Sequence, residues 1–503
     1  MATQAEVYDI KTNLNIGGKR SYPAAFSITS SINRYSQLVV VHHNGTRAEN
    51  SAIDITDDKV FKDMGQRQQD IFGSRSGPDT TMDVQVTGGK ADLKVNFKGY
   101  IVSPQYAFAI SSVDKKDECI DEFAEVDAFD GSIYGPIEKD EDRDFGAGAA
   151  DYGKAPDELG WSIPKCVSSI IDDMVNKGAE SFDDDVSADE EKNARKAQHA
   201  INSKVANKIK KMLSDSEDTF GWKDKLAEMA EDHYGMADSI HVALVNRLTS
   251  ASGSFMSTLI GIGSDFNCYV VPEDNNGKIK YKFVNRSKIY KDMKPITLPI
   301  TSMQAKAGTD GGLFPISYVA CISRTDDGNE TRDFANSHPY VAYPEQNVQK
   351  VMTAGGSVSK VLAPYWLPDM QNISTDLPDD GDPEEEGKDK MEQSTAEKAY
   401  DDKEKNRKEY RSVRVRVMKE WAKQFYLWQS LSASTVQLSG PLVKNISVGK
   451  YYNVKSVKGK ELFKGFCDTV TYSVTTQGSR SATYTAYFTN VEFGSFQLPG
   501  KDE

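Results

Sequence analysis

The stretch GFCDTVTYSVTTQGSRSATYTAYFTNVEF, residues 465–493, alternates between apolar and hydroxyl-bearing side chains on both sides of a short turn. The apolar positions are Phe466, Val470, Tyr472 and Val474 before the turn, and Ala482, Tyr484, Ala486 and Phe488 after it. This period of two, with a glycine-bearing loop at 476–479, predicts an antiparallel β-hairpin. Asp468 breaks the apolar parity, and the parity switches near Asn490, where we expect a bulge. An ordinary β-sandwich edge would show the same pattern.

The first 112 residues carry further strand patterns. Residues 25–32 alternate through Phe26 and Ile28, and 38–41 is a short apolar run that suits a buried strand. Residues 82–86 and 93–97 alternate on either side of a Gly-Gly turn, with polar side chains on the opposite parity, which predicts a half-buried hairpin. We expect it to continue into 99–102 after a bulge.

An acidic segment follows from Val113, and we expect an exposed, loop-rich insertion there. Inside it, Ser187–Glu190 has the spacing of a capping box. Apolar residues then recur at steps of three and four, at Ala194, Ala197, Ile201, Val205, Ile209 and Met212. This predicts an amphipathic helix that packs on its parent domain, with contact to another protein as the alternative.

Residues 220–283 have the pattern of a compact α/β unit. Three helices are predicted, near 222–235, 240–248 and 255–260, the last ending at Gly261 and Gly263, followed by a hairpin across 274–277. Asp376–Glu386 reads as a disordered acidic loop, and a charged helix is expected to start near Ser394. Residues 411–417 alternate like a strand, but the spacing of the aromatic residues after them favours a helix over 417–431.

The 503 residues suggest about three domains, and a formal net charge of −14 argues against electrostatic gripping of nucleic acid. Five scattered cysteines form neither a disulfide framework nor a C-x-x-C pair. The first residues lack the features of a signal peptide, and no apolar run is long enough to span a bilayer. We therefore expect a chain that folds in a reducing cytoplasm without a membrane anchor.

Residue patterns for catalysis or cofactor binding are absent from the sequence. There is no G-x-S-x-G and no Walker-type loop. His42 and His43 are adjacent, so on a strand they would point to opposite faces and would not easily share a metal ion. The acidic pairs, for example Asp121–Glu122 and Glu384–Glu385, are expected in solvated runs rather than in a cleft. The expectation is no catalytic, cofactor-binding or metal-binding residue, and no enzyme activity.

Several segments together resemble a known family. A helix, a Gly-Pro strand and the segments GFCDTVTYSV and ATYTAYFTNV resemble the closing barrel of the baseplate hub proteins of tailed phages. That family includes late-control tail proteins and the VgrG-type hubs of contractile injection systems. FKGYIVSP, residues 97–104, resembles the exit strand of the first hub barrel, and FNCYVVPEDNNGK, residues 266–278, resembles the small α/β domain between the barrels.

The resemblance implies an α+β, mainly antiparallel β protein, in which two tube-like β-barrels flank a small α/β domain and acidic helical or loop insertions. The expected units are an N-terminal barrel, 1–112; an acidic insertion with a helix, 113–215; the α/β domain, 216–300; a connecting region, 301–432, that includes a disordered loop, 376–388; and the C-terminal barrel strands, 433–503.

The function that the resemblance implies is that of the structural hub of a contractile tail. A homotrimer would form a pseudo-sixfold ring that joins the tail tube to the central spike in the virion, after assembly in the host cytoplasm. Spike, tail tube, baseplate wedge and tape-measure proteins are the expected partners. DNA would pass through without specific binding, along a lumen that the net charge predicts to be acidic.

Two other functions are weighed beside the hub. The first is a tail-associated peptidoglycan hydrolase that carries its activity in the 113–215 insertion. The second is a β protein that binds solutes or carbohydrates through Tyr365 and Trp366, which loop packing explains more simply.

Overall fold

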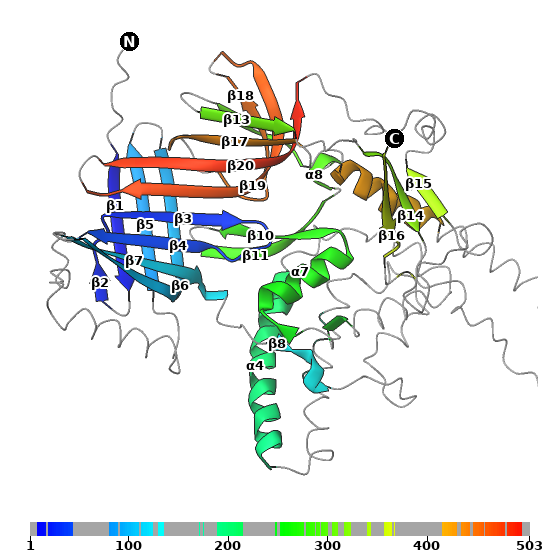
Figure 1. Ribbon diagram of the computed structural model, residues 1–503, viewed down its shortest axis with the longest axis horizontal. Helices are drawn as coiled ribbons and strands as arrows, with labels where there is room; N and C mark the ends of the chain where they lie inside the picture. The colour runs from blue at the N-terminus through cyan, green and yellow to red at the C-terminus, as the bar shows by residue number, and fades with distance from the viewer. Residues whose placement is uncertain are drawn as a thin grey trace, which may run out of the picture.

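The computed structural model is dominated by one large, mainly antiparallel sheet (Figure 1). The structure describes residues 8–16, 19–43, 80–88, 91–109, 112–123, 129–134, 189–214, 252–275, 278–286, 288–291, 293–299, 304–309, 316–322, 340–343, 357–364, 415–429, 434–442, 446–456, 458–477 and 480–494, together with 168, 171, 175, 247–248 and 367. The predicted helices near 222–235 and at 394, most of the one near 240–248, the acidic loop 376–388, and Tyr365 and Trp366 lie outside these residues.

Fifteen strands build the large sheet. They are β1 (Asp9–Ile16), β2 (Lys19–Ser21), β3 (Ala25–Ser31), β4 (Gln37–His43), β5 (Thr80–Gly88), β6 (Ala91–Ala109), β7 (Ser112–Asp121), β10 (Cys268–Asn275), β11 (Lys278–Asn285), β12 (Ile296–Pro299), β13 (Gln304–Thr309), β17 (Ser434–Pro441), β18 (Tyr451–Lys455), β19 (Glu461–Thr475) and β20 (Ser481–Phe493). The main path runs β13-β17-β20-β19-β3-β4-β7-β6-β5-β1-β2, so strands from the two ends of the chain share one sheet. A division into two separate barrels stays a prediction.

The hairpins expected from the sequence are confirmed. β19 pairs with β20 from Thr475–Ser481 onward, and the register shifts at Asp468 and near Asn490, whose φ of 56° is left-handed. β5 pairs with β6, and β3 pairs with β4. The bulge expected before residue 99 is not found in the β5–β6 register, and β6 instead carries a bulge opposite β7, after Ile101. Period-two patterning therefore located these strands and the faces that they bury.

The expectation of an exposed loop from Val113 is wrong for the first part of that segment. Residues 112–121 form β7, which pairs with β4 on one side and with β6 on the other. Asp117, Cys119 and Asp121 are buried, so two carboxylates replace apolar residues on the inward parity of this strand. The acidic composition therefore concealed a central strand.

Two elements of the predicted α/β unit are present in the described residues, its third helix and its hairpin, and the unit itself stays a prediction. α7 (Phe255–Asp265) begins at Ser254, whose hydroxyl accepts a hydrogen bond from the Ser257 amide at 3.2 Å, and leads into the β10–β11 hairpin. The expected stop at Gly261 and Gly263 is wrong, because the helix continues to Asp265. A side chain at Gly263 would crowd the Cys268 carbonyl and the Phe283 ring, so this glycine permits close packing instead.

The remaining elements surround the large sheet (Figure 1). α4 (Asp189–Ser214) is the predicted amphipathic helix, and it packs through Val205, Ile209 and Met212, while Ile201 stays exposed. β8 (Phe129–Asp130) and β9 (Ser252–Gly253) form a two-stranded sheet, and the 3₁₀ helix η2 (Gly131–Tyr134) directly follows β8 in the sequence. β14 (Ile316–Ile322), β15 (Tyr340–Tyr343) and β16 (Ser357–Leu362) form a three-stranded sheet, α8 (Lys288–Lys291) follows β11, and the helix predicted after residue 417 spans 415–429.

The layers cross at a steep angle. In Figure 1, β3, β4, β19 and β20 run side by side, and β1 and β5 pass behind β3 and β4 almost perpendicular to them. Phe26, Leu38 and Val84 from these strands and Phe97 of β6 lie in one buried hydrophobic cluster that also includes residues of the C-terminal hairpin and of β10. This single core places the β10–β11 hairpin beside both ends of the chain.

Candidate functional site

The seam between β3 and β19 joins the two ends of the chain. Seven residue pairs are in register, from Thr469 opposite Ser31 to Thr475 opposite Ala25. The Thr469 hydroxyl donates to the Ser31 hydroxyl at 3.0 Å. Beyond the paired residues, the Thr476 amide donates to the Ala24 carbonyl at 2.9 Å. Because each backbone bond here closes a loop of more than four hundred residues, the seam fixes the ends of the chain relative to each other.

The turn between β3 and β4 attaches the β10–β11 hairpin to this sheet. Asn33 has a left-handed φ of 54°, and its amide donates to the Val270 carbonyl at 2.7 Å. Its side-chain oxygen accepts a hydrogen bond from the Val270 amide at 2.9 Å. Asparagine tolerates a left-handed φ better than most residues. Its backbone amide and its side-chain carbonyl bind Val270 in the way that a residue of a neighbouring strand would. One residue thus satisfies both backbone groups of Val270.

Asp121 forms a buried polar link between three elements. Its carboxylate accepts hydrogen bonds from the Ser36 amide at 2.8 Å, from the Phe123 amide at 2.9 Å and from the Tyr281 hydroxyl. Burial raises the pKa of Asp121 from 3.8 to about 6, although these hydrogen bonds act in the opposite direction. Tyr281 also packs edge-on against Phe123, with 5.0 Å between ring centroids. The link ties β7, the β3–β4 turn and β11 together.

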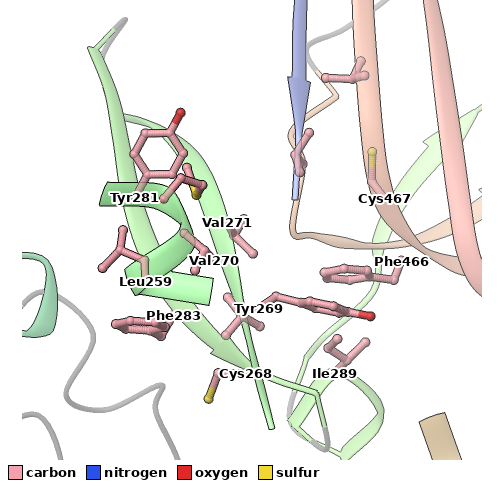
Figure 2. Packing of buried hydrophobic residues seen from close by; sticks show 14 of the residues in the cluster. Leu259, Cys268, Tyr269, Val270, Val271, Tyr281, Phe283, Ile289, Phe466 and Cys467 are labelled. Atoms are coloured by element: carbon pink, nitrogen blue, oxygen red, sulfur yellow. The ribbon is translucent and has the colours of Figure 1, made fainter. Parts of the chain in front are cut away.

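Aromatic packing connects the hairpin to the C-terminal strands. Figure 2 shows Tyr269 of β10 beside Phe466 of β19, and the rings are stacked with centroids 6.0 Å apart. Trp428, from the helix 415–429, meets Tyr269 edge-on at 4.9 Å. The Arg286 guanidinium lies 4.4 Å from the Tyr269 centroid and 5.2 Å from that of Trp428. Cation–π attraction therefore adds to the hydrophobic contact.

Gly449 and Glu273 complete the contact with the C-terminal strands. Gly449 has a φ of 75°, and any side chain there would collide with Val271 of β10. The Glu273 carboxylate lies 2.7 Å from the Lys282 ammonium and 3.4 Å from that of Lys450. Burial raises the pKa of Glu273, but the lysines outweigh this effect and the net shift is downward. The β10–β11 hairpin is thus wedged between the two ends of the chain by packing, hydrogen bonds and charge.

A second polar cluster surrounds His42, where the sequence argued against a metal site. His42 Nε2 lies 3.8 Å from Asp117 Oδ2, and Ser21 Oγ lies 3.4 Å from both ring nitrogens. A hydrolytic triad needs the serine and the aspartate on opposite ring nitrogens, and this arrangement does not provide that. The Lys115 ammonium is 3.6 Å from the same Asp117 oxygen. The cluster connects β2, β4 and β7 through polar and charged side chains.

The described segments also bear on metals, thiols and membrane spans. Within them, no group of three His, Cys, Asp or Glu side chains is placed to hold a metal ion. Cys119, Cys268, Cys321 and Cys467 are free and buried, and burial raises the pKa of Cys268 to about 12, which makes it a poor nucleophile. None of the helices described is long and apolar enough to cross a membrane. The expectation of no catalytic, cofactor or metal site stays a prediction.

One polar depression lies on the outward side of β1, β5 and β6. Its volume is about 390 Å³, and it is lined by Lys11, Thr12, Asn13, Asp83, Val84, Gln85, Lys94, Val95 and Asn96. The depression is open to solvent, and its charged groups are of both signs. It does not place two carboxylates in a cleft, as glycoside hydrolysis requires.

The residues that build the junction were not singled out in the sequence. Asn33 lies between two predicted strands, and a turn asparagine was the only signal available there. The expectation that Asp121 lies in a solvated acidic run is wrong, because Asp121 is buried and accepts hydrogen bonds from Ser36, Phe123 and Tyr281. Tyr281 belongs to a predicted hairpin whose partners were unknown, and Arg286 lies three residues beyond the end of that predicted hairpin. The junction is therefore a product of tertiary contacts.

Comparisons with known proteins find distant structural likeness and no family. No family model matches the chain, and no curated protein matches it. Among solved structures, it is similar to a tail protein from Neisseria meningitidis MC58, with 8% identity, a TM-score of 0.40 and coverage of 95% of this chain and 96% of the other.

Two further solved structures are similar at the same level. The 43 kDa tail protein of prophage MuSo2 from Shewanella oneidensis has 7% identity, a TM-score of 0.38 and coverage of 95% and 98%. The prophage tail protein gp18 from Listeria monocytogenes EGD-e has 9% identity, a TM-score of 0.36 and coverage of 95% and 94%. Likeness at these scores assigns neither family nor function, so the class defined here is that of a mainly antiparallel β protein with an α/β wedge.

Proposed function

We propose that this chain is the central baseplate hub of a contractile phage tail. Three copies form a pseudo-sixfold ring that joins the tail tube to the central spike and encloses the channel for DNA. The spike, tail tube, baseplate wedge and tape-measure proteins are its partners in the virion. The observation that supports this role is the open sheet that both ends of the chain build together.

The two ends of the sheet path are free on one side. Within the described residues, β13 pairs only with β17, and β2 pairs only with β1. An unpaired edge presents a row of backbone donors and acceptors that invites pairing with another chain. A closed ring of identical copies would satisfy such edges, because every copy offers the same two borders.

The β10–β11 hairpin connects the N-terminal and C-terminal strands rigidly, as a protein that transmits force between a tube and a spike requires. Asn33, Asp121 and Tyr281 fasten it to the N-terminal strands, and Tyr269 and Glu273 fasten it to the C-terminal side. A ring that joins a tube to a spike needs two halves that do not move relative to each other. Bracing of both halves by one hairpin supports that requirement.

Light scattering coupled to size-exclusion chromatography tests the assembly. The hub predicts a mass three times the 55.7 kDa of one chain. A monomer at every concentration tested would contradict the proposal.

Proline substitutions in β13 test the role of its edge. In an antiparallel pair, adjacent residues direct their amides to opposite sides of the strand. Of the two substitutions Ala305→Pro and Lys306→Pro, one therefore removes a backbone donor to β17 and the other removes a donor on the free side of β13. The substitution that removes the donor to β17 should destabilise the monomer. The substitution on the free side should lower only the trimer fraction.

The alternative of a peptidoglycan hydrolase in 113–215 finds no support in the described part of that segment. β7 belongs to the large sheet, and Asp117 and Asp121 are buried instead of lining a cleft. A zymogram with the purified chain tests it directly, since clearing of peptidoglycan would establish the activity.

A further inference from the structure

Between Thr469 and Thr475 of β19, and over the residues that pair with this stretch in register, the outward side chains of five neighbouring strands carry no charge, and we call this surface the neutral face. Its residues are Gln37, Val39 and Val41 of β4; Ala25, Ser27, Thr29 and Ser31 of β3; Thr469, Thr471, Ser473 and Thr475 of β19; Ser481, Thr483, Thr485 and Tyr487 of β20; and Thr435, Gln437 and Ser439 of β17. The registers place these residues in continuous rows. One row runs Ser439, Thr485, Thr471, Thr29, Gln37.

The absence of charge is specific to this side of the molecule. Asp, Glu, Lys and Arg make up 27% of the chain, and the outward side of β1, β5 and β6 carries Lys11, Asp83 and Lys94 among its residues. Charged groups reappear at the borders of the neutral face, with Lys116 and Glu118 on β7. On β19 the border is Asp468 at the register shift, and its carboxylate accepts a hydrogen bond from the Thr469 hydroxyl at 2.7 Å. Composition alone therefore does not account for it.

Most of the neutral face consists of hydroxyl groups in contact with water. Ser473 and Thr483 are exposed, Thr471 and Thr485 are half-buried, and Tyr487, the only large aromatic side chain of the face, is 44% exposed. The core of a permanent protein interface is apolar and aromatic. Burying rows of hydroxyls against a partner costs free energy unless each finds a hydrogen bond. The neutral face is therefore better suited to remain in contact with water than to form a permanent protein–protein interface.

We infer that the neutral face is the wall of the channel along which the DNA duplex passes, an inference that rests on the proposed hub function. A wall without cations makes no phosphate contacts that release counterions, so the duplex is not held. A wall without anions adds no repulsion that the entering polyanion must overcome. This neutral wall replaces the acidic lumen that the net charge of −14 predicted.

Cysteine labelling of the assembled protein tests the location. Ser473→Cys and Thr483→Cys, made singly, place a thiol on the neutral face, and Lys458→Cys places one on an exposed turn as the matched control. In the trimer, a small maleimide should label all three variants. A maleimide carried on a polyethylene glycol too large to enter the channel should label only Lys458→Cys. The wild-type chain measures the background from its native cysteines.

Each other outcome is distinguishable. Labelling of Ser473→Cys by the large reagent in the trimer would place the face outside and overturn the wall while leaving the hub intact. Protection from the small reagent, with disulfides between copies, would make it an interface between sister copies and also overturn the wall. Failure to form any oligomer would remove the channel and the hub together.

A charge variant gives an independent measurement. The double substitution Ser473→Lys with Thr483→Lys should leave the trimer mass unchanged and create affinity for a short DNA duplex that wild type lacks. That affinity should fall with salt by about 0.9 logarithmic units per decade for each phosphate contact. A trimer of this variant without any gain in duplex binding would contradict a wall that DNA touches.

Discussion

Thr29 and Thr471, which lie 442 positions apart in the sequence, share a hydrogen bond of 3.0 Å between their hydroxyls across the β3–β19 seam. The pair is the third of the seven residue pairs in the register that joins the two ends of the chain. Below the hydroxyls, Ile28 and Tyr472 are buried in the common core. The seam is therefore held by strand pairing, by side-chain hydrogen bonds and by apolar packing at once.

A double-mutant cycle on Thr29→Val and Thr471→Val measures the hydroxyl pair. Valine keeps the shape and the strand preference of threonine but removes the hydrogen bond. Each single variant should lower the free energy of unfolding by roughly 0.5–1.5 kcal/mol, and the double variant should cost less than the sum. Urea unfolding at one pH provides the values. Strict additivity would show that the hydroxyls do not interact.

Gly449→Ala should destabilise the contact between the C-terminal strands and β10. The substitution forces a left-handed conformation on alanine, which costs about 1–2 kcal/mol, and drives its methyl group into Val271. Crowding in a packed core adds roughly another 1–3 kcal/mol. Gly459→Ala is the matched control, because Gly459 has a φ of 78° and no atom within 4 Å of the added carbon. Equal losses of unfolding free energy for the two variants would refute the role of Val271.

The stabilising effect of Asp121 should depend on pH between about 4 and 6. Its folded pKa of about 6 lies above the ordinary 3.8, so the folded state holds the proton more tightly than the unfolded state. The contribution is complete below 3.8 and is lost as pH rises through 6, by roughly 3 kcal/mol from the two-unit shift. Asp121→Asn, which cannot ionise, removes this dependence.

Urea unfolding of wild type and Asp121→Asn at pH 4.5 and pH 8 checks this sign. The stability of wild type relative to the variant should be greater at the lower pH. Glu118→Gln is the control, since Glu118 lies on the same strand and forms a partly exposed ion pair with Lys116. A relative stability that increases with pH would mean that Asp121 is held as a stabilised anion.

Two substitutions at Asn33 separate its backbone role from its side-chain role. Asn33→Gly keeps the left-handed turn and loses the hydrogen bond from the Val270 amide, with an expected cost of about 1–3 kcal/mol. Asn33→Ala also pays the steric cost of that φ and should be less stable by roughly another 1–2 kcal/mol. Thermal unfolding ranks the two variants. Greater stability of the alanine variant would rule out a left-handed turn.

Side-chain periodicity accounts for most of the strands that the sequence predicted. Ala482, Tyr484, Ala486 and Phe488 are buried as their parity requires, because a strand in this sheet has one packed face and one wet face. β7 escaped prediction because Asp117 and Asp121 occupy inward positions where apolar residues are expected. α7 passes its two glycines because packing with Phe283 outweighs their low helix propensity. Local preference is a weak guide wherever tertiary contact opposes it.

By itself, the sequence determined the hairpins 465–493 and 82–97, the bulge near Asn490, the amphipathic helix after Ser187 and the helix after residue 417, since each follows from periods of two or 3.6 within a short window. The tertiary structure alone decided that β3 pairs with β19, that Asp121 meets Tyr281, and that the hydroxyl sides of five strands merge into one neutral face. Those relations join residues hundreds of positions apart. No local period encodes them, and they exist only because burial in a common core brings distant segments together.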